Sequence, residues 1–109
     1  MEASSIFAKP ETLVAAILQD DVSNQVLMLG WMNKEAYEKT LATRRVTFWS
    51  RSRNQLWVKG ESSGNFQDVV SISMDCDRDA LLVRVKGHGP ACHTGEISCF
   101  HETIIGSKN

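Results

Sequence analysis

The chain has 109 residues, of which 42% are hydrophobic and 23% are charged. This length suits one hydrophobic core and the composition is that of folded domains, so both argue against disorder and against a second domain. The formal net charge of −1 gives no overall attraction to nucleic acid or to an anionic membrane surface. We therefore expect a single domain over residues 1–109, with short tails at about 1–10 and 104–109.

The first patterned segments predict a β-hairpin. Residues 12–19 and 25–29 are short apolar runs, and the polar residues 20–24 between them favour a turn. Neither run approaches the roughly 20 apolar residues that span a bilayer, and the chain start has no signal-like apolar stretch. We expect a cytoplasmic protein without a membrane partner.

Residues 34–43 predict the one main helix. Ala36, Tyr37 and Leu41 recur there at helical spacing, which indicates one apolar face. Asn33 is a suitable N-cap because its side-chain oxygen can accept a hydrogen bond from the first turn.

The remaining segments are rich in β-formers and predict four more strands. These strands are expected over residues 46–50, 55–59, 69–74 and 80–86. From Gly87 onward the chain is dense in Gly, His, Cys and Pro, which is typical of an irregular loop that carries function. The predicted class is therefore α+β, with predominantly antiparallel strands and one main helix.

Three cysteines, Cys76, Cys92 and Cys99, are candidate ligands of Zn²⁺. Cys92 and Cys99 would be roughly 23 Å apart on a straight strand, so the chain must fold back to bring their sulfurs together, and Gly95 lies where it could do so. The spacing lacks the C-x2-C pair of structural zinc sites, and buried free cysteines are common. Spacing alone leaves both interpretations open.

A zinc ion with three protein ligands would keep one coordination position for water, as in catalytic sites. Three thiolates weaken the Lewis acidity of the metal, so a nearby base would be useful. His93, next to Cys92, is the leading candidate for this catalytic base, and His88 and His101 are its rivals.

Asp75, Asp77 and Asp79 alternate along the chain, which places their carboxylates on one side of an extended segment. If partly buried, the three would suit a hard cation such as Mg²⁺; if exposed, they form a solvated acidic turn. The pattern is not an EF-hand, because Ala80 stands where that loop needs glycine.

A basic stretch between residues 44 and 60 contains no acidic residue. It could bind phosphate groups, or single-stranded nucleic acid with Trp49 and Trp57 stacking on bases, or it could be a solvated strand face. For a phosphorylated small molecule, we expect contacts from Ser50, Arg51, Ser52, Arg53, Lys59, Ser63 and Gly64.

Four blocks, read together, resemble the phosphoribosyl-AMP cyclohydrolase family of histidine biosynthesis. The blocks are LMLGWMNKEAY, FWSRSRNQLWVKGESSGNFQDV, MDCDRDALL and GPACHTGEISCF, and the resemblance covers roughly residues 12–101. It implies hydrolysis of the N1–C6 bond of the adenine ring in 1-(5-phosphoribosyl)-AMP. It also implies the monofunctional form, because some relatives carry a fused pyrophosphohydrolase domain after this one and this chain ends at Asn109.

The resemblance also assigns roles to the candidate ligands. It implies that Cys76, Cys92 and Cys99 bind zinc, that Asp75, Asp77 and Asp79 bind magnesium, and that His93 is the general base. It further implies an intertwined homodimer in which Cys76 of one chain completes a zinc site with Cys92 and Cys99 of the other. The rival interpretations are a zinc-stabilised single-stranded nucleic-acid-binding module and a β-rich interaction domain without metals.

Overall fold

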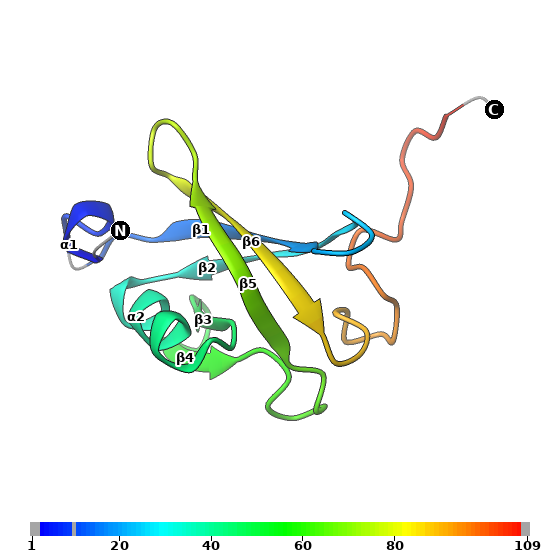
Figure 1. Ribbon diagram of the computed structural model, residues 1–109, viewed down its shortest axis with the longest axis horizontal. Coiled ribbons are helices and arrows are strands. Elements are labelled where there is room, and N and C mark those ends of the chain that lie inside the picture. The colour runs from blue at the N-terminus through cyan, green and yellow to red at the C-terminus, as the bar shows by residue number, and fades with distance from the viewer. Residues whose placement is uncertain (1–2, 10, 108–109) are drawn as a thin grey trace.

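A four-stranded sheet with the order β2–β1–β6–β5 forms the centre of the fold (Figure 1). Its strands are β1 (Val14–Asp20), β2 (Val26–Met32), β5 (Gln67–Met74) and β6 (Ala80–Gly87). This computed structural model describes residues 3–9 and 11–107, so the predicted tails lie partly outside the described residues. In the described part, no helix is both long and apolar enough to cross a membrane.

The strand pairing is mostly, but not wholly, antiparallel. β1 pairs antiparallel with β2, and β5 pairs antiparallel with β6. The two central strands, β1 and β6, are parallel. The predicted class is confirmed in its α+β character, its main helix and its mostly antiparallel strands, while the one parallel pair is a feature that local sequence patterns do not encode. All six predicted strands are present, with ends shifted by a few residues.

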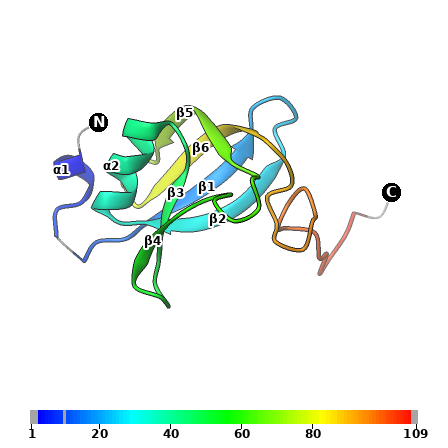
Figure 2. The same ribbon diagram turned by 90° about the horizontal axis from the view of Figure 1, so that it is seen from below.

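The core forms because the central strands alternate their side chains across the sheet. Val14, Ala16 and Leu18 of β1 are almost wholly buried, as are Leu81 and Val83 of β6. The helix α2 (Lys34–Thr43) and the hairpin of β3 (Thr47–Ser50) and β4 (Gln55–Val58) lie next to each other and contact β2 (Figure 2). A single turn, α1 (Ala3–Ile6), adds the buried Ile6.

Helix α2 has the predicted bounds, because its end signals are local. Asn33 Oδ1 accepts a hydrogen bond from Ala36 N at 2.9 Å, as an N-cap should. Of the three apolar residues at helical spacing, Ala36 and Tyr37 are buried, whereas Leu41 is 38% exposed. Thr40 takes the inner position instead, and its hydroxyl accepts a hydrogen bond from Thr47 N at 3.0 Å, which ties the helix to β3.

The β3–β4 hairpin is attached to the beginning of β5 through its backbone. Val46 N donates to the carbonyl oxygen of Gln67 at 3.0 Å, and Lys59 N donates to the carbonyl oxygen of Val46 at 2.9 Å. This attachment places the hairpin beside the loop that follows β6, because β5 and β6 are paired at Gln67 and Gly87.

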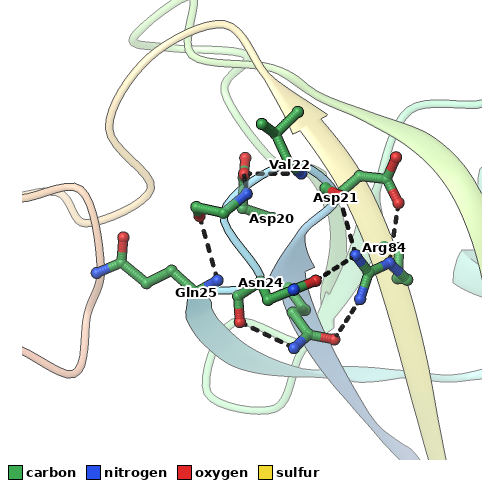
Figure 3. Close-up of polar contacts among 8 residues, drawn as sticks. Asp20, Asp21, Val22, Asn24, Gln25 and Arg84 are labelled. Atoms are coloured by element: carbon green, nitrogen blue, oxygen red, sulfur yellow. Dashed lines mark hydrogen bonds and ion pairs between the residues drawn. The ribbon is translucent and has the colours of Figure 1, made fainter.

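Arg84 of β6 fixes the turn between β1 and β2 (Figure 3). Its Nε donates to Asp21 Oδ1 at 2.8 Å, and its two terminal nitrogens donate to Gln19 Oε1 at 3.0 Å and Asn24 Oδ1 at 2.6 Å. The planar guanidinium group has donors pointing in several directions, so it can bind all of these acceptors at once. The turn therefore holds the beginning of β2 in one position relative to β6.

Candidate active site

A cavity of about 560 Å³ lies between the β3–β4 hairpin, the loop 59–65 and the segment 90–95. We call it the central cavity. Arg53 and Lys59 contribute positive charge to its wall, while Cys92 and His93 line it from the segment after β6. The cavity therefore joins anion-binding groups to candidate reactive groups.

Most of the predicted substrate-binding residues line the central cavity: Ser50, Ser52, Arg53, Lys59 and Ser63. Arg51 and Gly64 are not among its lining residues. The Arg51 guanidinium carbon lies 4.7 Å from the centre of the Trp31 ring, a cation–π contact outside the cavity. Gly64 has φ +80° and closes the turn that begins at Gly60.

The chain folds back between Cys92 and Cys99, as the sequence predicts. Gly95 has φ +93°, a conformation that suits glycine, and its N–H donates to the carbonyl oxygen of Cys92 at 3.0 Å. Cys92 N also donates to the carbonyl oxygen of Glu96 at 3.2 Å. The reversal brings the Cys92 and Cys99 thiols close enough to interact.

The reversed segment docks on the beginning of β2. The Ser98 hydroxyl donates to the carbonyl oxygen of Val26 at 2.7 Å, and Cys99 N donates to the carbonyl oxygen of Leu27 at 2.7 Å. Ser98 is 5% exposed, so its hydrogen bond is shielded from water. Arg84 of β6 holds the turn that leads into β2, and Cys99 is hydrogen-bonded to β2. The sheet therefore determines the position of Cys99.

Cys92 is surrounded by hydrogen-bond donors that favour its thiolate form. The Thr94 hydroxyl lies 3.0 Å from the Cys92 sulfur, the backbone N–H of Thr94 also contributes, and His101 Nε2 lies at 3.8 Å. Together, with Thr94 foremost, they lower the pKa of Cys92 to about 6. Desolvation, followed by the neighbouring Cys92, raises the pKa of Cys99. One sulfur of the pair is therefore ready to bind a metal at neutral pH.

Cys76 does not join this pair within one chain. It lies in the exposed turn between β5 and β6, whereas Cys92 follows the opposite end of β6 (Figure 1). Strand β6 alone spans roughly 23 Å at 3.3 Å per residue. The three predicted zinc ligands are therefore not brought together in a single protomer.

Asp75, Asp77 and Asp79 are brought together by the turn between β5 and β6, in which Arg78 has φ +61°, and not by the extended segment that the sequence predicts. They can each offer an oxygen within 4.8 Å of the others, and all three residues are exposed. A hydrogen bond from Asp79 lowers the pKa of Asp75, and the same contact together with the charges of Asp75 and Asp77 raises the pKa of Asp79. Such an oxygen cluster suits a hard cation.

The three histidines have different surroundings. His93 is exposed and lines the central cavity. His88 Nε2 lies 2.6 Å from Asp68 Oδ2, and His101 contacts the Cys92 sulfur. Of the three, only His93 is both next to Cys92 in sequence and part of the cavity wall.

Sequence reasoning missed two side chains at this site. Thr94 is the closest hydroxyl to the Cys92 sulfur, and a hydroxyl two residues after a cysteine in a glycine turn is the signal that could have indicated it. Glu61 lines the central cavity directly after the acid-free stretch, so a carboxylate faces the same space as the basic residues.

Comparisons with known proteins identify relatives over most of the chain. The family model described as Phosphoribosyl-AMP cyclohydrolase matches residues 28–101. A phosphoribosyl-AMP cyclohydrolase of Lactiplantibacillus plantarum is 53% identical over 90% of this chain and 91% of its own length. A phosphoribosyl-AMP cyclohydrolase of Clostridium botulinum strain 657 is 57% identical over 91% of this chain and 90% of its own length. A histidine biosynthesis bifunctional protein of Photobacterium profundum is 54% identical, and this chain spans 48% of its length.

Proposed function

The chain belongs to the phosphoribosyl-AMP cyclohydrolase family, and we propose that it acts by hydrolysing the N1–C6 bond of the adenine ring in 1-(5-phosphoribosyl)-AMP. The cyclohydrolase step of histidine biosynthesis follows from its similarity to the curated enzymes. The observation that most supports the bond assignment is the central cavity, which is lined by Arg53 and Lys59 and also by Cys92 and His93.

The donor set suits zinc. Cys92 and Cys99 offer adjacent sulfurs, and the hydrogen bonds from Thr94 favour the thiolate that zinc requires. We propose that these two residues and Cys76 hold the ion. When bound, zinc supplies the Lewis acidity that activates water for hydrolysis.

The proposal includes a second metal at Asp75, Asp77 and Asp79. Their oxygens lie close together, and carboxylate oxygens are the ligands that magnesium prefers. Magnesium there would offset the negative charge of a substrate with two phosphate groups. The proposed cofactors are therefore Zn²⁺ and Mg²⁺, held by different ligand types.

The proposed assembly is an intertwined homodimer with zinc sites shared between chains. Cys76 is exposed and is separated from Cys92 and Cys99 by the length of β6, so a second copy of the chain is the natural source of the third sulfur. All three cysteines are free thiols, which suits the reducing cytoplasm where we propose that the enzyme works.

With the two proposed metals bound, the residues of the chain can carry the remaining steps of the reaction. Arg53 and Lys59 bind phosphate oxygens, which orients the base toward Cys92 and His93. His93 takes a proton from the attacking water and returns a proton to N1 as the N1–C6 bond breaks. One water is consumed, and its oxygen becomes the carbonyl oxygen of the carboxamide product.

Incubation of the zinc-loaded protein with 1-(5-phosphoribosyl)-AMP tests this function. We expect the ultraviolet absorbance to change as the ring opens, and a product with the mass of the substrate plus one water. Treatment with a zinc chelator should stop turnover, and added zinc should restore it. A zinc-loaded, folded protein that leaves the substrate unchanged would contradict the proposal.

A further inference from the structure

Asn65 is held between two glycines at the wall of the central cavity. A Cβ atom at Gly89 would lie 2.2 Å from Asn65 Oδ1, and one at Gly60 would lie 2.4 Å from the carbonyl carbon of Asn65. Both distances are far below van der Waals contact. Asn65 therefore occupies the space that a side chain at position 60 or position 89 would fill, so both positions require glycine.

The backbone around Asn65 is also fixed. Asn65 N donates to the Ser63 hydroxyl at 3.2 Å, and the next residue, Phe66, accepts a hydrogen bond from His88 N at 2.9 Å. The segment from His88 through Gly89 continues to Cys92 and His93. The carboxamide of Asn65 is thus positioned relative to the segment that carries the reactive groups.

The carboxamide of Asn65 has unused hydrogen-bonding capacity at the edge of the cavity. Within residues 3–9 and 11–107, no hydrogen bond to its side-chain atoms is present, and Asn65 is among the lining residues. Gln67, two residues later, is different, because it is wholly buried against Gly87 and does not line the cavity. Asn65 therefore presents an adjacent donor and acceptor to whatever fills the cavity.

We propose that Asn65 is a specificity-determining residue that binds the edge of the substrate base formed by the nitrogen at C6 and by N7. This inference rests on the proposed function. In the proposed function the phosphates bind at Arg53 and Lys59 and the base lies toward His93, and Asn65 lines the same cavity as these three residues. An asparagine carboxamide pairs with the exocyclic nitrogen at C6 and with N7 of an adenine-type base, accepting from one and donating to the other.

This pairing has a chemical consequence for the reaction. Two hydrogen bonds at the C6 and N7 edge fix the rotation of the base, so that C6 is presented to the attacking water. A 6-oxo base offers two acceptors at the same edge, and the Asn65 oxygen would then have no donor to pair with. Asn65 should therefore favour 6-amino over 6-oxo purine nucleotides.

Calorimetric titration with AMP and with IMP tests the proposal directly. These two nucleotides differ at C6, and their binding can be measured whether or not the protein turns over phosphoribosyl-AMP. The wild-type protein should bind AMP more tightly than IMP. Asn65→Leu keeps the approximate shape of the side chain but removes the oxygen that accepts from the 6-amino group, and it should reduce the AMP-over-IMP preference by about 10- to 100-fold.

Gln55→Leu is the matched control, because Gln55 also lines the central cavity and the change likewise replaces an amide with an aliphatic side chain. It should change the affinity for both nucleotides alike and leave the ratio of the two affinities unchanged. An Asn65→Leu protein with the wild-type ratio would overturn the proposal, as would a wild type without preference for AMP. Failure of turnover alone would overturn the proposed function and not the role of Asn65.

Discussion

Replacing Ser98 with alanine tests whether docking of the cysteine segment on β2 prepares the zinc ligands. The Ser98 hydroxyl donates to the carbonyl oxygen of Val26 at 2.7 Å and accepts from Phe100 N at 3.0 Å. The substitution removes both hydrogen bonds and leaves the Cys99 N hydrogen bond to Leu27 in place. The segment should therefore lose part of its attachment without losing a zinc ligand.

The expected magnitude follows from these two contacts. A neutral hydrogen bond contributes about 0.5–1.5 kcal/mol net, so the free energy of unfolding should fall by about 1–3 kcal/mol. Zinc affinity should fall by at most the same free energy, which is about 5- to 150-fold. Ser71→Ala is a suitable control, because Ser71 is exposed on β5 and the change should stay within about 0.5 kcal/mol.

Urea denaturation of the metal-free protein measures the first quantity, and competition with a chromophoric chelator measures the second. Both should change for Ser98→Ala and neither for Ser71→Ala. A Ser98→Ala protein with wild-type stability and wild-type zinc affinity would refute the reasoning that the sheet positions Cys99.

Three further predictions concern the cavity and the turn. Arg53→Ala should raise KM about 10- to 100-fold in steady-state kinetics, because a hydrogen bond to a charged group contributes about 1.5–3 kcal/mol; Arg51→Ala should raise it less, since Arg51 lies over Trp31. His93→Ala should lower kcat by about 100-fold or more with unchanged zinc content, and a wild-type kcat would remove His93 as the base. Hydrogen bonds, with the backbone N–H of Ser23 foremost, lower the pKa of Asp20 below 3.8. The contribution of the Asp20 carboxylate to the stability of the fold is therefore present above that pH and is lost as the pH falls through the folded pKa. The Tm advantage of wild type over Asp20→Asn should thus be full at neutral pH and shrink in acid; an advantage that grows in acid would contradict this.

The helix and the cysteine reversal could be predicted because their signals are local. Asn33 caps α2 through a contact three residues away, and Gly95 turns the chain within the segment that it joins. The burial of Thr40 in place of Leu41 could not be predicted in this way, because it depends on a hydrogen bond to Thr47 in another element. The parallel pairing of β1 with β6 is likewise a contact between segments far apart in sequence.

The candidate site was predictable in its chemistry and less so in its placement. The three aspartates do lie close together, but the turn between β5 and β6 brings them there and not the alternation along an extended segment. Charge alone could not indicate that Arg53 faces the central cavity while Arg51 stacks on Trp31, because that difference depends on the path of the turn between β3 and β4. The separation of Cys76 from Cys92 follows from β6 running between them, and the strand predicted over residues 80–86 already indicates it.

Subunit complementation tests the central claim most directly. Cys76→Ser and Cys92→Ser proteins should each be inactive, because each lacks one ligand in every shared zinc site. Unfolding and refolding an equal mixture should restore about a quarter of wild-type turnover, since half of the dimers are mixed and each has one intact site of two. A mixture that forms mixed dimers and stays inactive would contradict a zinc site built from two chains.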